Sequence, residues 1–122
     1  MEQRLTAILP CNDLDAAQAF FERLGFKWEE GSPDDYRMLS DGRGGFVHLH
    51  RAVEGWLEAG RSPFGLYLYR EDVDAVAASF AGETLGPPRD TPWGMYEFAL
   101  NGPDDTLLRV GWPTRLRNQK TH

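Results

Sequence analysis

The stretch that decides the fold is NDLDAAQAFF, residues 12–21, because it returns 59 positions later as EDVDAVAASF, residues 71–80. Five positions are identical: Asp13, Asp15, Ala16, Ala19 and Phe21 correspond to Asp72, Asp74, Ala75, Ala78 and Phe80. Early acidic residues and apolar residues every three or four positions predict an amphipathic helix in each copy. Gly25 and Gly82 are predicted to end the two helices. The chain therefore contains two copies of one unit.

Short strand-like segments flank each predicted helix. In the first copy they are LTAIL (5–9), FKWEE (26–30), DYRML (35–39) and GFVHLHR (45–51). In the second they are GLYLY (65–69), ETLG (83–86), MYEFAL (95–100) and TLLRVGW (106–112). Turn residues such as glycine, proline and aspartate separate the segments. This order predicts an α+β fold of two tandem βαβββ repeats, with curved mixed sheets around a cleft.

The length of 122 residues predicts one domain. We expect repeat one at about 4–52, a connector at 53–63 with one helical turn around Trp56, repeat two at about 64–112, and a solvated tail at 113–122. A unit of roughly 55 residues with one helix buries little apolar surface alone. The two units should therefore pack together, within one chain or across a dimer.

Composition excludes several classes of function. The formal charge of −6 opposes binding to the phosphate backbone of nucleic acids. No apolar run approaches the roughly 20 residues that span a bilayer. The start, MEQRLTAILP, lacks the pattern of a signal peptide, so we expect a cytoplasmic protein. Cys11 is the only cysteine and cannot form an internal disulfide.

Strand alternation predicts which side chains face away from the helices. Val47 and Leu49 should meet the helix, which leaves His48 and His50 on the open face. The same reasoning applies to the strands of the second copy, and the 59-residue repeat extends it to the first strand. The expected concave wall combines Thr6, Ile8, His48, His50, Tyr67, Tyr69 and Arg109.

The duplicated plan resembles the vicinal oxygen chelate superfamily, and within it the glyoxalase and bleomycin-resistance group. The resemblance rests on LDAAQAFFERLGF (14–26) and PWGMYEFALNGPDDTLLRV (92–110), and it covers residues 4–112. Metal-dependent members place ligands at four strand positions, which are occupied here by Thr6, His48, Gly65 and Arg109. Only His48 is a good ligand for a divalent ion, since glycine has no side-chain donor and a guanidinium has no free lone pair. The resemblance therefore implies a member without metal ligands.

Bleomycin-resistance proteins are metal-free members that dimerise and hold an aromatic, cationic drug in a cleft between subunits. The resemblance matches Trp93 to a loop tryptophan that stacks on planar ligands, and Tyr36 to an aromatic residue that lines the pocket. Arg109 would favour a carboxylate or phosphate instead of a cation, unless it forms an ion pair with an acid such as Glu97. His48 and His50 are either hydrogen-bonded wall residues or ligand contacts. The family's Asp-Pro-x-Gly turn is replaced by GPDD at 102–105.

The leading hypothesis is a homodimer that sequesters an aromatic or carboxylate-bearing small molecule without a cofactor, as in antibiotic resistance. The expected ligand-binding residues are Thr6, Tyr36, His48, His50, Tyr67, Tyr69, Trp93 and Arg109. A metal-dependent glyoxalase or dioxygenase with a displaced site, and a structural or regulatory dimer without a ligand, remain alternatives. The sequence contains no catalytic triad, phosphate-binding glycine loop or dinucleotide fingerprint, so it predicts no catalytic residue.

Overall fold

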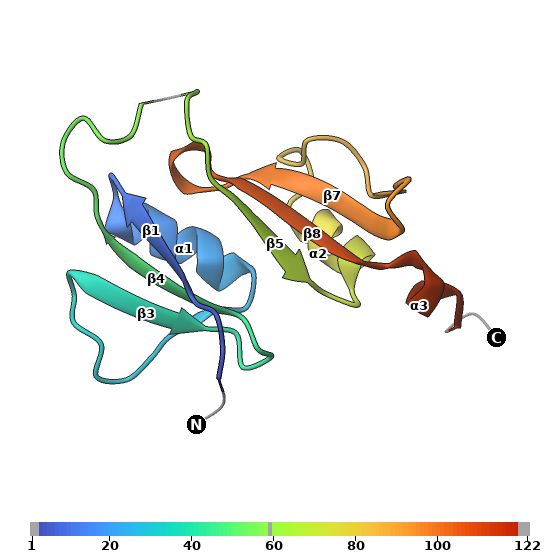
Figure 1. Ribbon diagram of the computed structural model, residues 1–122, viewed down its shortest axis with the longest axis horizontal. Coiled ribbons are helices and arrows are strands. Elements are labelled where there is room, and N and C mark those ends of the chain that lie inside the picture. Colours follow the sequence, from blue (N-terminus) through green and yellow to red (C-terminus); the bar gives the residue numbers. More distant parts are fainter. Residues whose placement is uncertain (1–2, 59, 120–122) are drawn as a thin grey trace. The chain divides into compact units, whose positions relative to one another are not determined.

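The computed structural model of the chain describes residues 3–58 and 60–119. The chain divides into two compact units, with the boundary between Arg61 and Ser62. This boundary lies inside the connector predicted at 53–63. Each unit contains a four-stranded sheet with parallel and antiparallel pairs. The expectation of two tandem βαβββ units with mixed sheets is therefore confirmed (Figure 1).

The first unit contains, in chain order, β1 (Ala7–Cys11), α1 (Leu14–Arg23), β2 (Lys27–Trp28), β3 (Tyr36–Ser40) and β4 (Phe46–Arg51). Its sheet has the strand order β1-β4-β3-β2. Strand β4 is parallel to β1 and antiparallel to β3. Because β1 begins two residues later than the predicted segment at 5–9, Thr6 lies just before it.

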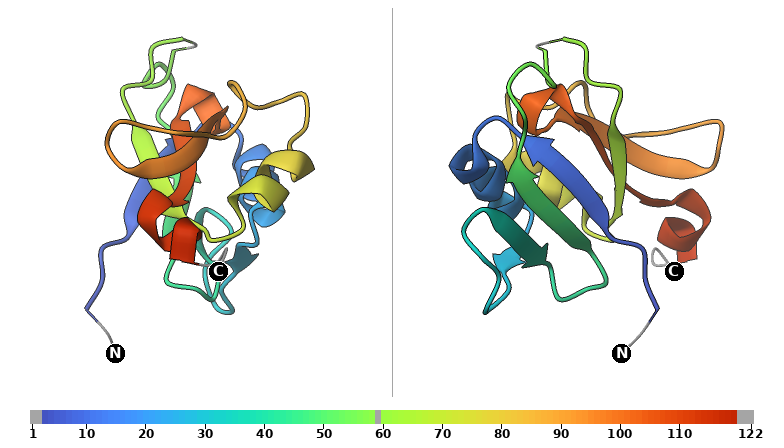
Figure 2. Two further views of the ribbon diagram at one scale, coloured as in Figure 1. Left: turned by 90° about the vertical axis from the view of Figure 1, so that its right-hand side faces the viewer. Right: turned by 60° about the vertical axis from the view of Figure 1, so that its left-hand side comes forward.

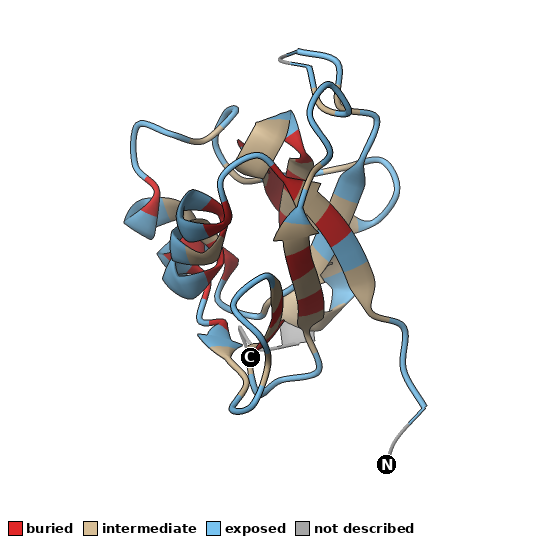
Figure 3. Cartoon of the chain, turned by 90° about the vertical axis from the view of Figure 1, so that its left-hand side faces the viewer, coloured by how far each residue is buried: buried red, intermediate tan, exposed pale blue. Residues whose placement is uncertain are grey.

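Burial along β4 alternates as the sequence predicts. Val47 and Leu49 are 2% and 0% exposed, whereas Phe46, His48 and His50, which alternate with them, are only half-buried. Bands of buried and less buried residues alternate along the strands in Figure 3. Helix α1 packs against β4 and covers the apolar face of the sheet (Figure 2). Both histidines therefore lie on the face opposite the helix.

The repeated segments form the helices in both units. Asp13 is the N-cap of α1, and its Oδ1 accepts a hydrogen bond from Ala16 N at 3.0 Å. Beyond the C-terminal ends lie Gly25 and Gly82, with φ of 93° and 85°. Glycine reaches this left-handed region without the steric penalty that a Cβ imposes. The two glycines therefore end the helices as predicted.

The second unit contains β5 (Gly65–Tyr69), α2 (Val73–Ser79), β6 (Arg89–Asp90), β7 (Met95–Asn101), the 3-10 helix η1 (Pro103–Asp105), β8 (Leu107–Pro113) and α3 (Thr114–Gln119). Its sheet has the order β5-β8-β7-β6, which repeats the topology of the first unit. Strand β8 is parallel to β5 and antiparallel to β7. Helix α2 packs against β7 and β8.

The prediction of a strand at 83–86 is wrong. Thr84 makes a single antiparallel bridge with Leu100, and regular pairing with β7 resumes only at β6. The intervening Gly-Pro-Pro segment at 86–88 explains the shift, because proline has no N–H to donate to a ladder. The edge strand of the second sheet is therefore short and lies further along the chain.

Two other expectations also need correction. The connector forms a tight turn instead of a helical turn: Trp56 N donates to Val53 O at 3.0 Å, and Gly55 has a φ of 89°. The tail is not simply solvated, because α3 forms within it. In α3, the Arg117 guanidinium lies 3.4 Å from the centre of the Tyr96 ring. Residues 120–122 of the predicted tail lie outside the described residues.

The α-helices of the described ranges are short, with ten, seven and six residues in α1, α2 and α3. Within residues 3–58 and 60–119, none has the length and apolar character needed to cross a membrane.

Candidate functional site

The sheets of the two units have four pairs of equivalent positions on their open faces. Ile8 lies opposite His48 in the parallel pair of the first unit, and Tyr67 lies opposite Arg109 in that of the second. On the antiparallel side, Tyr36 pairs in register with His50, and Glu97 pairs with Gly111. The open face of each sheet therefore carries a matching set of four positions, filled by different residues.

In the first unit these positions form an aromatic cluster. The Tyr36 hydroxyl and His48 Nδ1 share a hydrogen bond of 3.1 Å. The His50 ring stacks on Tyr36, with centroids 6.2 Å apart and planes 11° from parallel. His50 Nδ1 lies 3.1 Å from Arg51 O, and because a carbonyl oxygen only accepts, Nδ1 carries the proton. Both histidines are half-buried and hydrogen-bonded.

In the second unit the equivalent position to Tyr36 holds an acid, Glu97, which is only 6% exposed. Its Oε1 accepts hydrogen bonds from Trp93 Nε1 at 2.8 Å and from the Tyr67 hydroxyl at 3.0 Å. Its Oε2 accepts from Arg109 Nη1 at 3.2 Å, which forms an ion pair. The carboxylate therefore links residues of β5, β8 and the loop before β7. The ion pair between Arg109 and Glu97, one of the two alternatives for Arg109, is therefore formed.

Gly111 makes room for this arrangement. A Cβ added at Gly111 would lie 2.9 Å from Glu97 Cβ and would overlap the Tyr67 hydroxyl. Real Cβ atoms essentially never approach other atoms so closely, so any larger side chain would push Tyr67 away from the carboxylate. The first unit has His50 at the equivalent position and Ile8 in place of Tyr67. The phenol of Tyr67 can therefore cross β8 only because position 111 is a glycine.

The environment of Tyr67 stabilises its neutral form. Burial raises the pKa of the phenol, and the hydrogen bond to Glu97 and the negative charge of that carboxylate raise it further. The neighbouring Arg109 acts in the opposite direction but more weakly. Tyr67 is therefore a hydrogen-bond donor at neutral pH and not a base.

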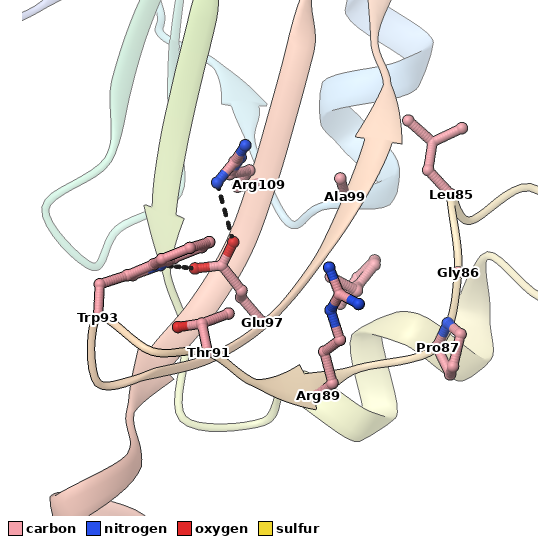
Figure 4. Close-up of a pocket in the computed structure, with 10 residues that line it drawn as sticks. Leu85, Gly86, Pro87, Arg89, Thr91, Trp93, Glu97, Ala99 and Arg109 are labelled. Carbon is pink, nitrogen blue, oxygen red and sulfur yellow. Dashed lines mark hydrogen bonds and ion pairs between the residues drawn. The ribbon is translucent and has the colours of Figure 1, made fainter.

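A pocket of about 210 Å³ opens beside this network, wholly within the second unit (Figure 4). Glu97, Arg109 and Trp93 form one part of its wall. Arg89 extends from β6 beside Glu97, and Thr91 and five apolar residues complete the lining. The remaining lining residues are Leu85, Gly86, Pro87, Thr91, Phe98 and Ala99.

The residues predicted to bind a ligand divide between the two units. Thr6, Tyr36, His48 and His50 belong to the first, and Tyr67, Tyr69, Trp93 and Arg109 belong to the second. Of the second group, Trp93 and Arg109 line the pocket. Tyr67 reaches the same carboxylate, and Tyr69 lies next to Tyr67, with ring centroids 5.1 Å apart.

Sequence reasoning missed the central place of Glu97 and the presence of Arg89. Glu97 was considered only as a partner for Arg109, although its 61-residue offset from Tyr36 could have placed it on the open face. Nothing in the sequence marked Arg89, because the strand that carries it was predicted at 83–86.

The donor set at the four metal-ligand positions of the resemblance does not fit a divalent ion. His48 already bonds to Tyr36, Gly65 has no side chain, and Arg109 contributes a positive charge held by Glu97. Among the residues that the structure describes, no group of three or more His, Cys, Asp or Glu side chains could hold a metal ion.

The sequence matches no protein-family model and none of the curated proteins. Solved structures do match. A bleomycin resistance determinant encoded on the transposon Tn5 is 29% identical, with a TM-score of 0.75 over 92% of this chain and 98% of that one. A bleomycin-binding protein complexed with bleomycin is 26% identical, with a TM-score of 0.72 over 91% and 98%. A glyoxalase/bleomycin resistance protein/dioxygenase from Nocardioides is 17% identical, with a TM-score of 0.72 over 93% and 84%.

The fold thus defines an α+β protein of two βαβββ units whose structural neighbours are bleomycin-resistance and glyoxalase/bleomycin resistance/dioxygenase proteins. These are members of the vicinal oxygen chelate superfamily, and the resemblance read from the sequence is confirmed.

The steric role of Gly111 predicts a difference between two glycine substitutions. Gly111→Ala should lower the free energy of unfolding by about 1–3 kcal/mol, because the added methyl group overpacks against Tyr67 and Glu97. Gly65→Ala is the matched control, since its Cβ would find only Leu107 O at 3.9 Å. Urea unfolding measures both. Equal midpoints for the two variants would contradict the crowding at position 111.

The charge of Glu97 should govern the ionisation of Tyr67. Glu97→Gln removes the negative charge that favours the neutral phenol, so the pKa of Tyr67 should fall toward its ordinary value, while burial keeps part of the increase. Ultraviolet titration of the tyrosines, with Tyr67→Phe to assign the signal, measures this.

A matched control exists in the same unit. The Tyr96 hydroxyl donates to Asp74 Oδ1 at 2.5 Å, and this bond raises the pKa of Tyr96. Asp74→Asn should therefore lower the pKa of Tyr96 and leave Tyr67 unchanged. A Tyr67 titration that is the same in the wild type and in Glu97→Gln would refute the coupling.

Proposed function

We propose that this protein binds a small aromatic or carboxylate-bearing molecule non-covalently and without a metal ion, as a resistance-type binding protein. The observation that carries the proposal is the state of Trp93. Its indole N–H is held by Glu97 at 2.8 Å, yet the residue is 58% exposed and lines the pocket. The Arg109 guanidinium lies 5.8 Å from the centre of the Trp93 ring, and the rest of the exposed indole is a fixed aromatic surface on which a planar ligand can stack with little loss of side-chain entropy.

The rest of the pocket supports a ligand that is partly apolar. Leu85, Pro87, Phe98 and Ala99 supply apolar surface, while Glu97 and Arg109 supply the polar groups. The lining thus combines apolar side chains with a few placed polar and charged groups, both of which occur in small-molecule sites. The Arg109 side chain is 41% exposed and remains accessible despite its ion pair.

The comparisons support binding but do not name a ligand for this chain. One neighbour is a bleomycin resistance determinant and another is a bleomycin-binding protein, at 29% and 26% identity. The proposal includes the other residues predicted from the sequence as ligand contacts: Thr6, Tyr36, His48, His50, Tyr67 and Tyr69. The cytoplasmic location predicted from the sequence is also part of it.

The role of Trp93 can be tested with 2-naphthoate as a probe by isothermal titration calorimetry. We expect measurable binding to the wild type, and binding at least about tenfold weaker in Trp93→Ala, which corresponds to about 1.4 kcal/mol of lost stacking and contact. Trp56→Ala is the control, because Trp56 is similarly exposed, at 60%, but belongs to the connector and is not one of the residues that line the pocket.

Two outcomes would count against the proposal. If the wild type does not bind, or if Trp93→Ala and Trp56→Ala bind as the wild type does, the pocket is not the binding site. If EDTA abolishes binding and added zinc restores it, the metal-free part is wrong.

A homodimer is also part of the proposal, motivated by the family resemblance and by the small apolar area of a single βαβββ unit. Sedimentation at micromolar concentration should give twice the chain mass. A monomer mass under these conditions would refute the dimer.

A further inference from the structure

Two arginines line the pocket, and Arg89 differs from Arg109 in its contacts. Arg89 lies in β6, directly opposite Glu97 in the antiparallel register. Directly paired residues point to the same face of a sheet, so its guanidinium extends beside the Glu97 carboxylate (Figure 4). Within residues 3–58 and 60–119, however, the side chain of Arg89 makes no hydrogen bond or ion pair, and only its backbone pairs with β7. The guanidinium of this exposed residue is therefore not held by any described side chain.

Glu97 is already occupied by other donors. Its two oxygens accept from Trp93, Tyr67 and Arg109, and the positive charge of Arg109 balances its negative charge. Among the residues that the structure describes, no other charged residue lines the pocket, so this lining has two guanidinium groups and one carboxylate. The pocket therefore carries one net positive charge, in a chain whose overall formal charge is −6.

The position of Arg89 relative to the apolar wall suggests how a ligand is oriented. In Figure 4 its guanidinium points toward the part of the pocket formed by Ala99 and Leu85. The Trp93 ring lies on the other side of Glu97. A volume of about 210 Å³ is below the roughly 300–1,000 Å³ of sites for drug-sized ligands, so one or two fused rings suit this unit better than a large molecule.

We infer that Arg89, and not Arg109, anchors the anionic group of the ligand, and that the pocket selects planar aromatic molecules with one carboxylate. The inference rests on the proposed function and gives it a specificity-determining residue. A free guanidinium can form two parallel hydrogen bonds with a carboxylate, whereas Arg109 would first have to leave Glu97. Leaving Glu97 as a buried, uncompensated charge is costly.

The test compares 2-naphthoate with its uncharged amide, 2-naphthamide, by isothermal titration calorimetry. The wild type should bind the carboxylate about tenfold more tightly than the amide. Arg89→Gln should weaken 2-naphthoate binding about tenfold and change 2-naphthamide binding by less than about twofold, so that the preference disappears. Arg89→Lys, which keeps the charge but not the paired donors, should retain part of the preference.

Arg115→Gln is the matched control, because it removes the same charge from an exposed position in α3 that does not line the pocket. It should bind both probes as the wild type does. The inference is overturned if Arg89→Gln retains the preference, or if Arg109→Gln loses it while Arg89→Gln does not. In either case binding by the wild type still supports the proposed function, whereas failure of both probes to bind the wild type refutes the proposed function itself.

Discussion

The buried carboxylate of Glu97 is the group on which the arrangement of the second unit's open face depends. It is almost inaccessible to solvent, and a buried charge is tolerated only when it is paired and hydrogen-bonded. Trp93, Tyr67 and Arg109 meet that requirement from three separate segments. The same bonds fix the orientation of an exposed indole and offset the charge of a guanidinium. One electrostatic requirement thus shapes both the aromatic and the charged parts of the pocket.

At the equivalent positions of its sheet, the first unit has no buried carboxylate. Tyr36 and His48 occupy the places of Glu97 and Arg109, and their hydrogen bond of 3.1 Å matches the 3.2 Å ion pair of the second unit. A neutral pair costs less to desolvate, and it needs no additional donors from a loop. The duplicated scaffold therefore preserves the diagonal contact between its third and fourth strands, while the chemistry of that contact differs.

Much of the fold was predictable because its determinants are local. The repeated helix, its terminal glycines and the alternation in β4 all follow from spacing along the chain. The site was less predictable because it depends on contacts across strands. That Arg109 pairs with Glu97 was only one of two alternatives, and the three-donor role of Glu97 follows from register and from the space above Gly111. Arg89 was missed because the Gly-Pro-Pro segment moved the edge strand, which no periodicity reveals.

Gly111 limits which residues could be transferred from one half of the chain to the other. The halves differ at four equivalent pairs of positions on their open faces: Ile8 and Tyr67, Tyr36 and Glu97, His48 and Arg109, His50 and Gly111. A histidine at 111 would occupy the space of the Tyr67 phenol, so the residue of the first half cannot be moved to this position without displacing Tyr67 from the Glu97 carboxylate. Each half therefore works as a set of matched residues: a large side chain at 67 requires glycine at 111, and the His50 of the first half faces the shorter Ile8 side of its sheet.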